Sequence, residues 1–198
     1  MDYTASTTTG SFGGRVRGTM GGALAGAAAT VPMSAFMELA HRELPFWERH
    51  SLPPRKITER VLRRAGVSRF LKEPERLAAT LASHFGYGAA CGAVYGATWP
   101  RERIGIASGV AFGLAVWTGS YLGWLPATGL MAPATWHSRR RNALMIGAHV
   151  VWGAALGAAA RALIGRRRRD ATETEAEPID VDERAYTITS RAAYAAVL

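Results

Sequence analysis

Four long stretches of the chain contain no Asp, Glu, Lys or Arg, and this segregation of charge is what most constrains the fold. The stretches are residues 19–37, 77–99, 104–138 and 142–160. A helix needs about 20 apolar residues to cross the roughly 30 Å hydrocarbon core of a bilayer. Helices of soluble proteins normally keep a polar face. The sequence therefore predicts an integral membrane protein rather than a soluble protein with Ala-rich core helices.

The average composition hides this pattern, because 20% of the residues are charged and the mean hydropathy is only +0.01. Gly and Ala, which score low on hydropathy scales, fill the charge-free stretches. We predict an all-α fold, a polytopic four-helix transmembrane bundle. Its helices are expected at about 17–39, 77–98, 104–125 and 142–164.

The predicted membrane domain covers residues 15–165, between two tails. Residues 1–14 are rich in Thr, Ser and Gly, and residues 166–198 are basic and then acidic, so both tails are expected to be disordered. Arg15 and Arg17 before an apolar run could also mark a signal peptide. That run is too long for a signal sequence, so a retained first helix is expected.

The first connecting segment contains a short basic amphipathic helix at about 55–65. Its apolar side chains are Ile57, Val61 and Leu62, and the basic side chains that we expect to face lipid are Lys56, Arg60, Arg63 and Arg64. A helix of this kind can lie at a bilayer surface and bind anionic headgroups. It can equally be a surface helix that packs on the bundle.

The chain carries a net charge of +9, which could indicate nucleic-acid binding. Most basic residues, however, flank the apolar spans, where they can meet lipid phosphates. The expected partner is therefore the lipid bilayer and not nucleic acid. The richness in Arg and Ala suggests a bacterial cytoplasmic (inner) membrane protein with several spans. Four spans put both termini on one side, and the cluster at 166–169, which directly follows its helix, favours a cytoplasmic location for them.

Small residues recur every four positions in all four predicted helices, so that each set lies on one helix face. In lipid, such faces allow close backbone approach and tight helix packing. They could act within one chain or in a homo-oligomer. The glycines concerned are Gly18, Gly22, Gly26, Gly88, Gly92, Gly96, Gly105, Gly109, Gly113, Gly153 and Gly157.

An internal repeat links the second and fourth predicted helices. Residues 84–93 (HFGYGAACGA) match residues 149–158 (HVVWGAALGA) in the His, in an aromatic at the fourth place and in two Gly. The chain is thus interpreted as two copies of a two-helix hairpin, related by an axis along the membrane normal.

His84 and His149 are the first candidate site, because ionisable groups in spans usually face the interior and are often functional. Each lies about seven residues into its predicted helix, roughly 10 Å deep. Two imidazoles at matched depth could ligate a single haem b or transfer protons. They could also be interior side chains with hydrogen bonds only. No other cofactor and no metal is predicted.

Two further groups are weaker candidates. Glu38 and His41 lie one turn apart at the end of the first helix and predict an interfacial charge network. Thr118, Ser120 and Tyr121 are hydroxyls that we expect to bond the preceding turn or a neighbouring helix. The sequence contains no nucleophile–base set, phosphate loop or paired carboxylates in a span, so no catalytic residue is assigned. Cys91 is interpreted as a small packing residue.

The order of features resembles the YagU-like family of bacterial inner-membrane proteins. The resemblance covers residues 18–164 and rests on His84, on Leu125-Pro126 with Gly129-Leu130 and Pro133, and on residues 148–152 (AHVVW). It implies topology and an inner-membrane location, and no activity. The favoured function is a non-enzymatic membrane interaction or stress-related protein. The alternatives are proton, ion or haem handling at the histidines, and binding of anionic lipid by the basic helix.

Overall fold

The structure is a computed structural model that describes residues 6–49 and 51–175, with side chains for 13–49 and 51–164. The chain divides into two compact units, Met1–Arg166 and Arg167–Leu198, and the arrangement below is that of the first unit. Helices make up the described part of the chain, which contains no strand. The α-helices are α1 (Ser6–Arg42), α2 (Pro53–Arg64), α3 (Glu73–Thr98), α4 (Ile106–Thr118), α5 (Leu125–Ala127) and α6 (Arg139–Glu175). A π-helix, η4 (Gly119–Trp124), joins α4 to α5, and 3-10 turns occupy η1 (Phe46–Glu48), η2 (Ser68–Phe70), η3 (Arg101–Arg103) and η5 (Ala134–Trp136).

Three helical segments among the described residues are long and apolar enough to cross a membrane: Gly13–Arg42, Ile106–Ala127 and Arg139–Ile164. The prediction of an all-helical chain is confirmed for the described residues, and these three segments have the length and composition of the predicted membrane spans. Helix α3 has 26 residues, enough length to cross, but its Gly, Ala, Ser, Thr and Tyr residues make it less apolar.

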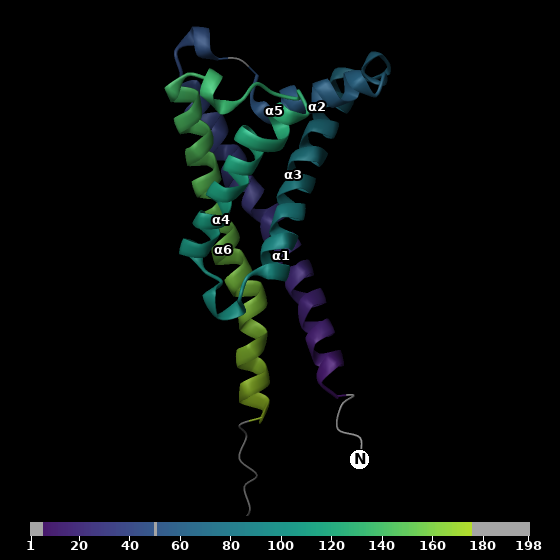
Figure 1. The fold of residues 1–198 in the computed structure, drawn as a ribbon, viewed down its shortest axis with the longest axis vertical. Helices are drawn as coiled ribbons and strands as arrows, with labels where there is room; N and C mark the ends of the chain where they lie inside the picture. Colours follow the sequence, from purple (N-terminus) through teal and green to yellow (C-terminus); the bar gives the residue numbers. More distant parts are fainter. Residues whose placement is uncertain (1–5, 50, 176–198) are drawn as a thin grey trace, which may run out of the picture. The chain divides into compact units, whose positions relative to one another are not determined.

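Helices α1 and α3 pack against each other through their glycines. A Cβ atom added to Gly22 would lie less than 3.0 Å from backbone atoms of Gly92 and Gly96, and one added to Gly26 would meet Gly88 and Gly92 in the same way. Gly18 faces the Gly96 carbonyl. The numbers rise on one helix as they fall on the other, so α1 and α3 are antiparallel (Figure 1).

Helices α4 and α6 form a second antiparallel pair of the same kind. A Cβ atom on Gly109 would lie less than 3.0 Å from backbone atoms of Gly153 and Gly157, and one on Gly157 would meet Gly105. Gly113 faces the carbonyl of His149. The glycines that could have mediated contacts between copies of the chain therefore pack within it.

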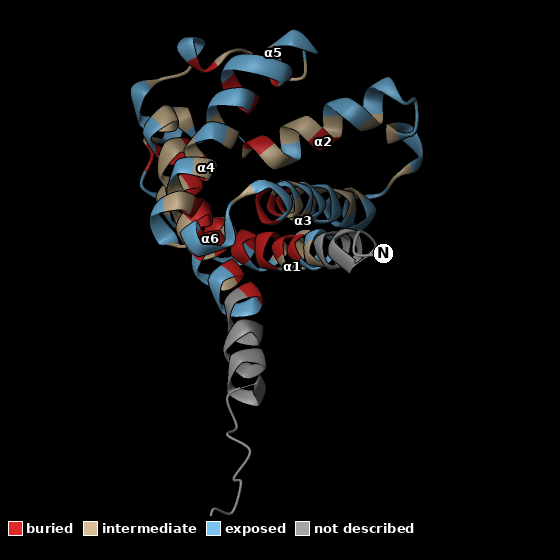
Figure 2. Ribbon diagram, turned by 60° about the horizontal axis from the view of Figure 1, so that its bottom comes forward, coloured by how far each residue is buried: buried red, intermediate tan, exposed pale blue. Residues whose placement is uncertain are grey.

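Aromatic and polar contacts join the two pairs. Trp152 of α6 donates from Nε1 to the carbonyl of Gly26 at 3.2 Å. Between α3 and α4, the hydroxyls of Tyr95 and Ser108 lie 2.7 Å apart, and the Tyr95 ring lies 5.2 Å from that of Phe112. Figure 2 shows buried residues gathered where α1, α3 and α6 face one another. Each helix pair thus contacts the other on its inner side.

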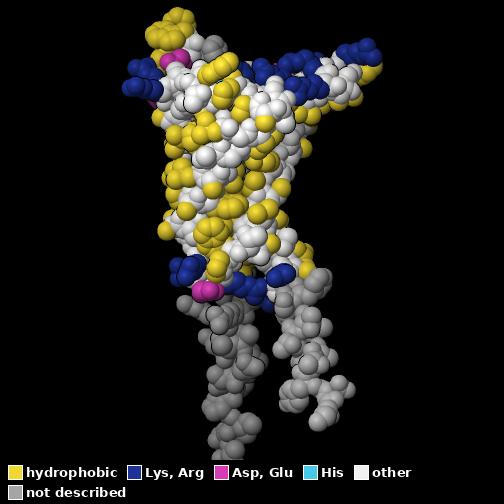
Figure 3. Space-filling model, viewed as in Figure 1, with side chains coloured by type: hydrophobic (Ala, Val, Ile, Leu, Met, Phe, Trp, Pro, Cys, Tyr) yellow, Lys and Arg dark blue, Asp and Glu magenta, His cyan; other side chains and the backbone are white. Residues whose placement is uncertain are grey.

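The surface of the first unit is apolar between two basic ends. Figure 3 shows hydrophobic side chains and exposed backbone over the middle, with Lys and Arg gathered at both ends of the described part. Phe46 and Trp136 are 79% and 80% exposed at the end that carries α2. Exposed aromatics next to basic residues are typical of the lipid headgroup region.

Several helix ends differ from the sequence prediction. Helix α1 begins at Ser6, inside the tail 1–14 that was expected to be disordered, and α6 continues to Glu175 beyond the predicted end at 164. Neither extension contains Pro, and the second contains four Arg and two Glu, which favour helix. The remaining parts of both predicted tails, 1–5 and 176–198, lie outside the described residues. The third predicted helix ends its α-helical part early, at Thr118, where the π-helix begins.

The glycine contacts give the two hairpins a register that differs from the sequence repeat. The three glycine levels of α1 meet Gly96, Gly92 and Gly88 of α3. The three glycine levels of α4 meet Gly157, Gly153 and His149 of α6 in the same order. His84 then corresponds to Met145 and not to His149. The repeat aligned on the two histidines is therefore shifted by one helical turn, about 6 Å along the axis.

Candidate functional site

A cavity of about 410 Å³ lies among α1, α2, α3, η4, α5 and α6. This volume falls within the range of small-molecule sites, about 300–1,000 Å³. Its walls are mainly apolar, with Met33 and Met37 from α1, Leu125 from α5 and Trp152 from α6. The cavity begins where the glycine contacts end, because Gly88 belongs to both. Larger side chains beyond this level keep the helices apart.

Helix α2 closes one side of the cavity with its apolar face. Ile57, Val61 and Leu62 all line the cavity, so the face predicted to be apolar packs on the bundle. A hydrogen bond between the hydroxyls of Thr58 and Ser83, 2.7 Å long, joins α2 to α3. The sequence left open whether this helix lies on the bilayer surface or packs on the bundle. In the structure its apolar face packs on the bundle.

The basic residues of α2 divide into three environments. Arg60 donates to the carbonyl of Leu130 at 2.7 Å, and Arg64 donates to that of Thr128 at 2.7 Å. Lys56 is half-buried and lines a second cavity on the other side of the helix, and Arg63 is exposed. The two arginines thus tie α2 to the segment after α5.

The π-helix presents polar side chains to the cavity. The hydroxyls of Ser120 and Tyr87 lie 2.9 Å apart, and Trp124 Nε1 donates to the Ser120 oxygen at 3.3 Å. Tyr121 donates to the sulfur of Met145 at 3.3 Å. Thr118 bonds the preceding turn at Leu114. A π-helical turn often marks a functional site, and here it turns Ser120 and Tyr121, two of the predicted hydroxyls, into buried positions.

His84 and His149 both line this cavity. The Nδ1 atom of His149 lies 2.7 Å from the carbonyl of Met145, and a proton on Nδ1 leaves Nε2 of the neutral ring as an acceptor. The Nε2 atom of His84 is buried and has no hydrogen-bond partner in the structure. Buried polar atoms normally have a partner, so His84 places a polar atom without one in the wall of the cavity, among the described residues.

His84, His149 and Cys91 are the residues of this cavity whose side chains most readily ligate a metal. No group of three or more His, Cys, Asp or Glu side chains in the described part could hold an ion. A metal bound here would thus take at most two protein ligands, which matches the two axial positions of a haem iron.

The group at the end of α1 lies apart from the cavity. Glu38 and Arg42 form a salt bridge of 3.0 Å with both side chains more than half exposed. Exposed pairs of this kind contribute little stability, about 0–1 kcal/mol. The salt bridge joins Glu38 to Arg42 rather than to His41, and the predicted interfacial charge network stays a prediction.

Sequence reasoning found the histidines and the hydroxyls of η4 but missed Ser83, Tyr87, Trp124 and Met33. The charge-free windows contain them, yet only helix packing shows which face of each window borders the cavity. Comparison of the chain with protein-family models, with curated proteins and with solved structures finds no match. The resemblance to the YagU-like family therefore stays a prediction.

Proposed function

We propose that this chain is a non-enzymatic, four-span protein of the bacterial inner membrane that binds a small, mainly apolar molecule in the cavity beneath α2. Binding of such a molecule is compatible with the non-enzymatic membrane interaction or stress-related function that the sequence favours. The observation that carries the proposal is the unpartnered Nε2 atom of His84 in the wall of a large apolar cavity. Two steps support it, one for the topology and one for the ligand.

The first step concerns the number of crossings. Gly21, near the start of the first span, lies against Ile164 at the end of the last, since an added Cβ would be 3.0 Å from the Ile164 side chain. When the start of the first span and the end of the last span lie side by side, the chain crosses the membrane an even number of times. Three spans satisfy the length and hydropathy criteria, so α3, antiparallel to α1, is proposed as the fourth.

The second step concerns the chemistry of the ligand. The threonine, serine and tyrosine hydroxyls around the cavity already bond one another, backbone carbonyls or, for Tyr121, the sulfur of Met145. The apolar walls would bury most of a ligand's surface, and a few polar groups would fix its orientation. A ring or short chain that carries one hydroxyl or carbonyl near His84 fits this arrangement.

Cys91 provides a direct test, because it lines the cavity and is the one cysteine of the chain. The purified protein in detergent is labelled with N-cyclohexylmaleimide in the presence of 2-naphthol or of naphthalene. We expect 2-naphthol to slow the labelling of Cys91 more than naphthalene does. His84→Phe keeps a ring of similar size and removes the hydrogen bond, so it should abolish this difference.

A matched control moves the thiol out of the cavity. Gly86 has no heavy atom within 4 Å of an added Cβ, so Gly86→Cys combined with Cys91→Ser places a thiol on the open side of α3. Its labelling should not respond to 2-naphthol. If Cys91 shows no protection, or if His84→Phe still prefers 2-naphthol, the proposed site is wrong.

A second candidate function is haem b binding, favoured by the position of both histidines on one cavity. Visible spectra of protein expressed with ample haem, oxidised and then reduced with dithionite, test it. A Soret band that is lost in His84→Ala and in His149→Ala would support a b-type cytochrome. A flat spectrum would remove this candidate and leave the apolar ligand.

A further inference from the structure

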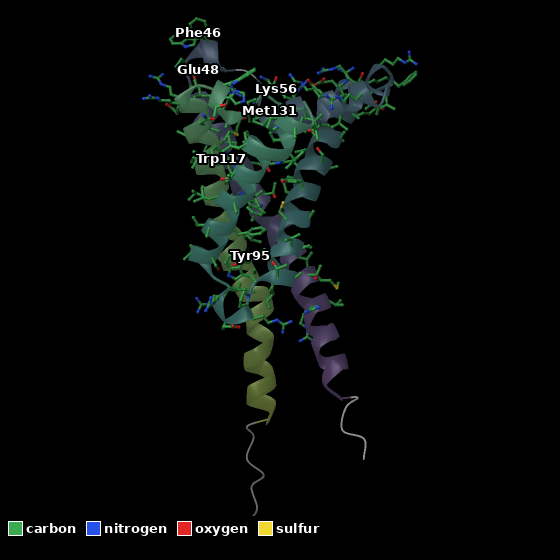
Figure 4. The ribbon with its side chains drawn as sticks, in the orientation of Figure 1. Phe46, Glu48, Lys56, Tyr95, Trp117 and Met131 are labelled. Atoms are coloured by element: carbon green, nitrogen blue, oxygen red, sulfur yellow. The ribbon has the colours of Figure 1, made fainter. Side chains whose placement is uncertain are left out.

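A second cavity, of about 320 Å³, lies on the other side of α2 at the same end of the bundle. Figure 4 labels Glu48, Lys56 and Met131 of its lining, all near that end. Its basic lining residues come from three separate segments: Lys56 and Arg60 from α2, His137 from the turn after η5, and Arg141 from the first turn of α6. Polar side chains are frequent in its wall, in contrast to the apolar cavity.

The cations of this cavity, Lys56, Arg60 and Arg141, form no salt bridge among the described residues, whose ion pairs join Arg42 or Arg55 to glutamates. Arg60 and Arg141 donate to the backbone carbonyls of Leu130 and Glu48, both at 2.7 Å. The side-chain ammonium of Lys56 has neither a hydrogen bond nor an ion pair to the described residues.

One carboxylate reaches the cavity, that of Glu48, and it accepts a hydrogen bond from Ser138 at 2.6 Å. Three fixed cations against one carboxylate leave a net charge of about +2, which one phosphate monoester carries with the opposite sign near pH 7. The buried Nε2 atom of His137 also has no partner. The cavity therefore holds an excess of positive charge, which the one carboxylate does not neutralise, and a buried polar atom without a partner among the described residues.

Burial and neighbouring positive charges lower the pKa of two groups that line this cavity. Burial, followed by the positive charges of Arg141 and Arg60, lowers the pKa of Lys56. Burial, followed by the charges of Arg141 and Lys56, lowers the pKa of His137, against a hydrogen bond to Ala132 that raises it. Folding thus brings these groups together at a cost in free energy to their charged forms, and a bound anion would offset that cost.

We propose that the cavity lined by Lys56, Arg60, His137 and Arg141 binds a phosphate group. Guanidinium groups bind phosphate with two parallel hydrogen bonds, and Lys adds a point charge. The exposed aromatics Phe46 and Trp136 place this end at the headgroup level, where a phospholipid is a source of phosphate besides the free ion. The inference does not depend on a ligand in the apolar cavity.

The test measures thermal unfolding of the full chain in an uncharged detergent. One arm adds inorganic phosphate, with chloride at equal ionic strength as its reference. The other arm adds short-chain phosphatidic acid, with phosphatidylcholine of the same chain length as its reference. We expect the midpoint to rise in at least one arm. A rise with both ligands means that the site takes phosphate from either source, and a rise with phosphatidic acid alone assigns it to a lipid headgroup.

Lys56→Gln is the decisive variant, because it removes one cation without removing a hydrogen bond. It should weaken binding at least ~10-fold, as expected for one charged partner, while leaving the protein without ligand as stable as the original or more so. A residue needed only for folding would lower stability instead. Lys72→Gln and Arg63→Gln remove the same charge outside the cavity and should bind normally.

Two results would overturn the proposal. One is no rise of the midpoint with either ligand in the original protein. The other is an equal response of Lys56→Gln and Lys72→Gln, which would mean that phosphate acts on the surface charge as a whole.

Discussion

The first unit has two regions that use opposite kinds of packing. In one, α1 against α3 and α4 against α6, backbone meets backbone at glycine, and an added Cβ at Gly22 or Gly109 would lie less than 3.0 Å from the neighbouring helix. In the other, beneath α2, the same helices separate around a cavity of about 410 Å³. The change occurs at Gly88 and His149, which contribute to both regions.

This difference shows how a small helical bundle can combine close helix packing in one region with a cavity in another. Helices in lipid are held by close contact and hydrogen bonds rather than by a hydrophobic drive. The glycine contacts provide that contact over several turns. The separated ends can then be closed by α2 through side chains, with Thr58 bonded to Ser83 and two arginines bonded to the segment 128–130.

The largest expected effect comes from a methyl group in the tight region. Gly92→Ala puts its Cβ less than 3.0 Å from backbone atoms of Gly22 and Gly26, so we expect a loss of about 1–3 kcal/mol, as for overpacked cores. Gly86→Ala, on the same helix with open space around it, should gain up to about 1 kcal/mol through helix propensity. Equal effects of the two changes on the free energy of unfolding would contradict the glycine contact.

An intermediate effect is expected from the polar wall of the hollow region. Ser120→Ala removes the partner of Tyr87 and of Trp124. Because these two side chains are 41% and 40% exposed, the loss should be about 0.5–1.5 kcal/mol, the usual net contribution of a hydrogen bond. Thr118→Ala removes a bond within its own helix on an exposed face and should change stability by less than about 0.5 kcal/mol. Chemical denaturation in mixed micelles measures both. A larger loss in Thr118→Ala would mean that the π-helix does not depend on these bonds.

The smallest effect concerns acid. Burial lowers the pKa of His137 from its ordinary 6.5, so on acidification the unfolded chain takes up this proton before the folded one does. Stability should fall as the pH drops below about 6.5, until the folded protein is protonated as well. His137→Gln has no titratable side chain at this position, so its unfolding midpoint should depend less on pH between pH 7 and pH 5. The same slope in both proteins would assign the acid sensitivity to other groups.

Much of the helical framework could be predicted from the sequence, because lack of charge and the four-residue glycine period are local patterns. These periods mark the packing faces of Gly22 and Gly92, but they do not say that these two glycines meet. Nor do they give the register of His84 against His149, which depends on which glycine levels meet and differs by one turn between the two helix pairs. The basic cavity could not be predicted either. Lys56 and Arg141 are distant in the sequence, and only the folding of α2 over the end of α6 brings their charges together.

The crossing of α3 is the central claim, because it puts both cavities at the membrane face that carries α2. Cysteines at Arg69, before α3, and at Glu102, after it, each in a Cys91→Ser background, can be labelled in sealed inverted and right-side-out vesicles with a membrane-impermeant maleimide. The account predicts labelling from opposite sides, and the sides also give the orientation of the chain. Labelling of both cysteines from the same side would show that α3 does not cross, and would contradict the four-span protein proposed here.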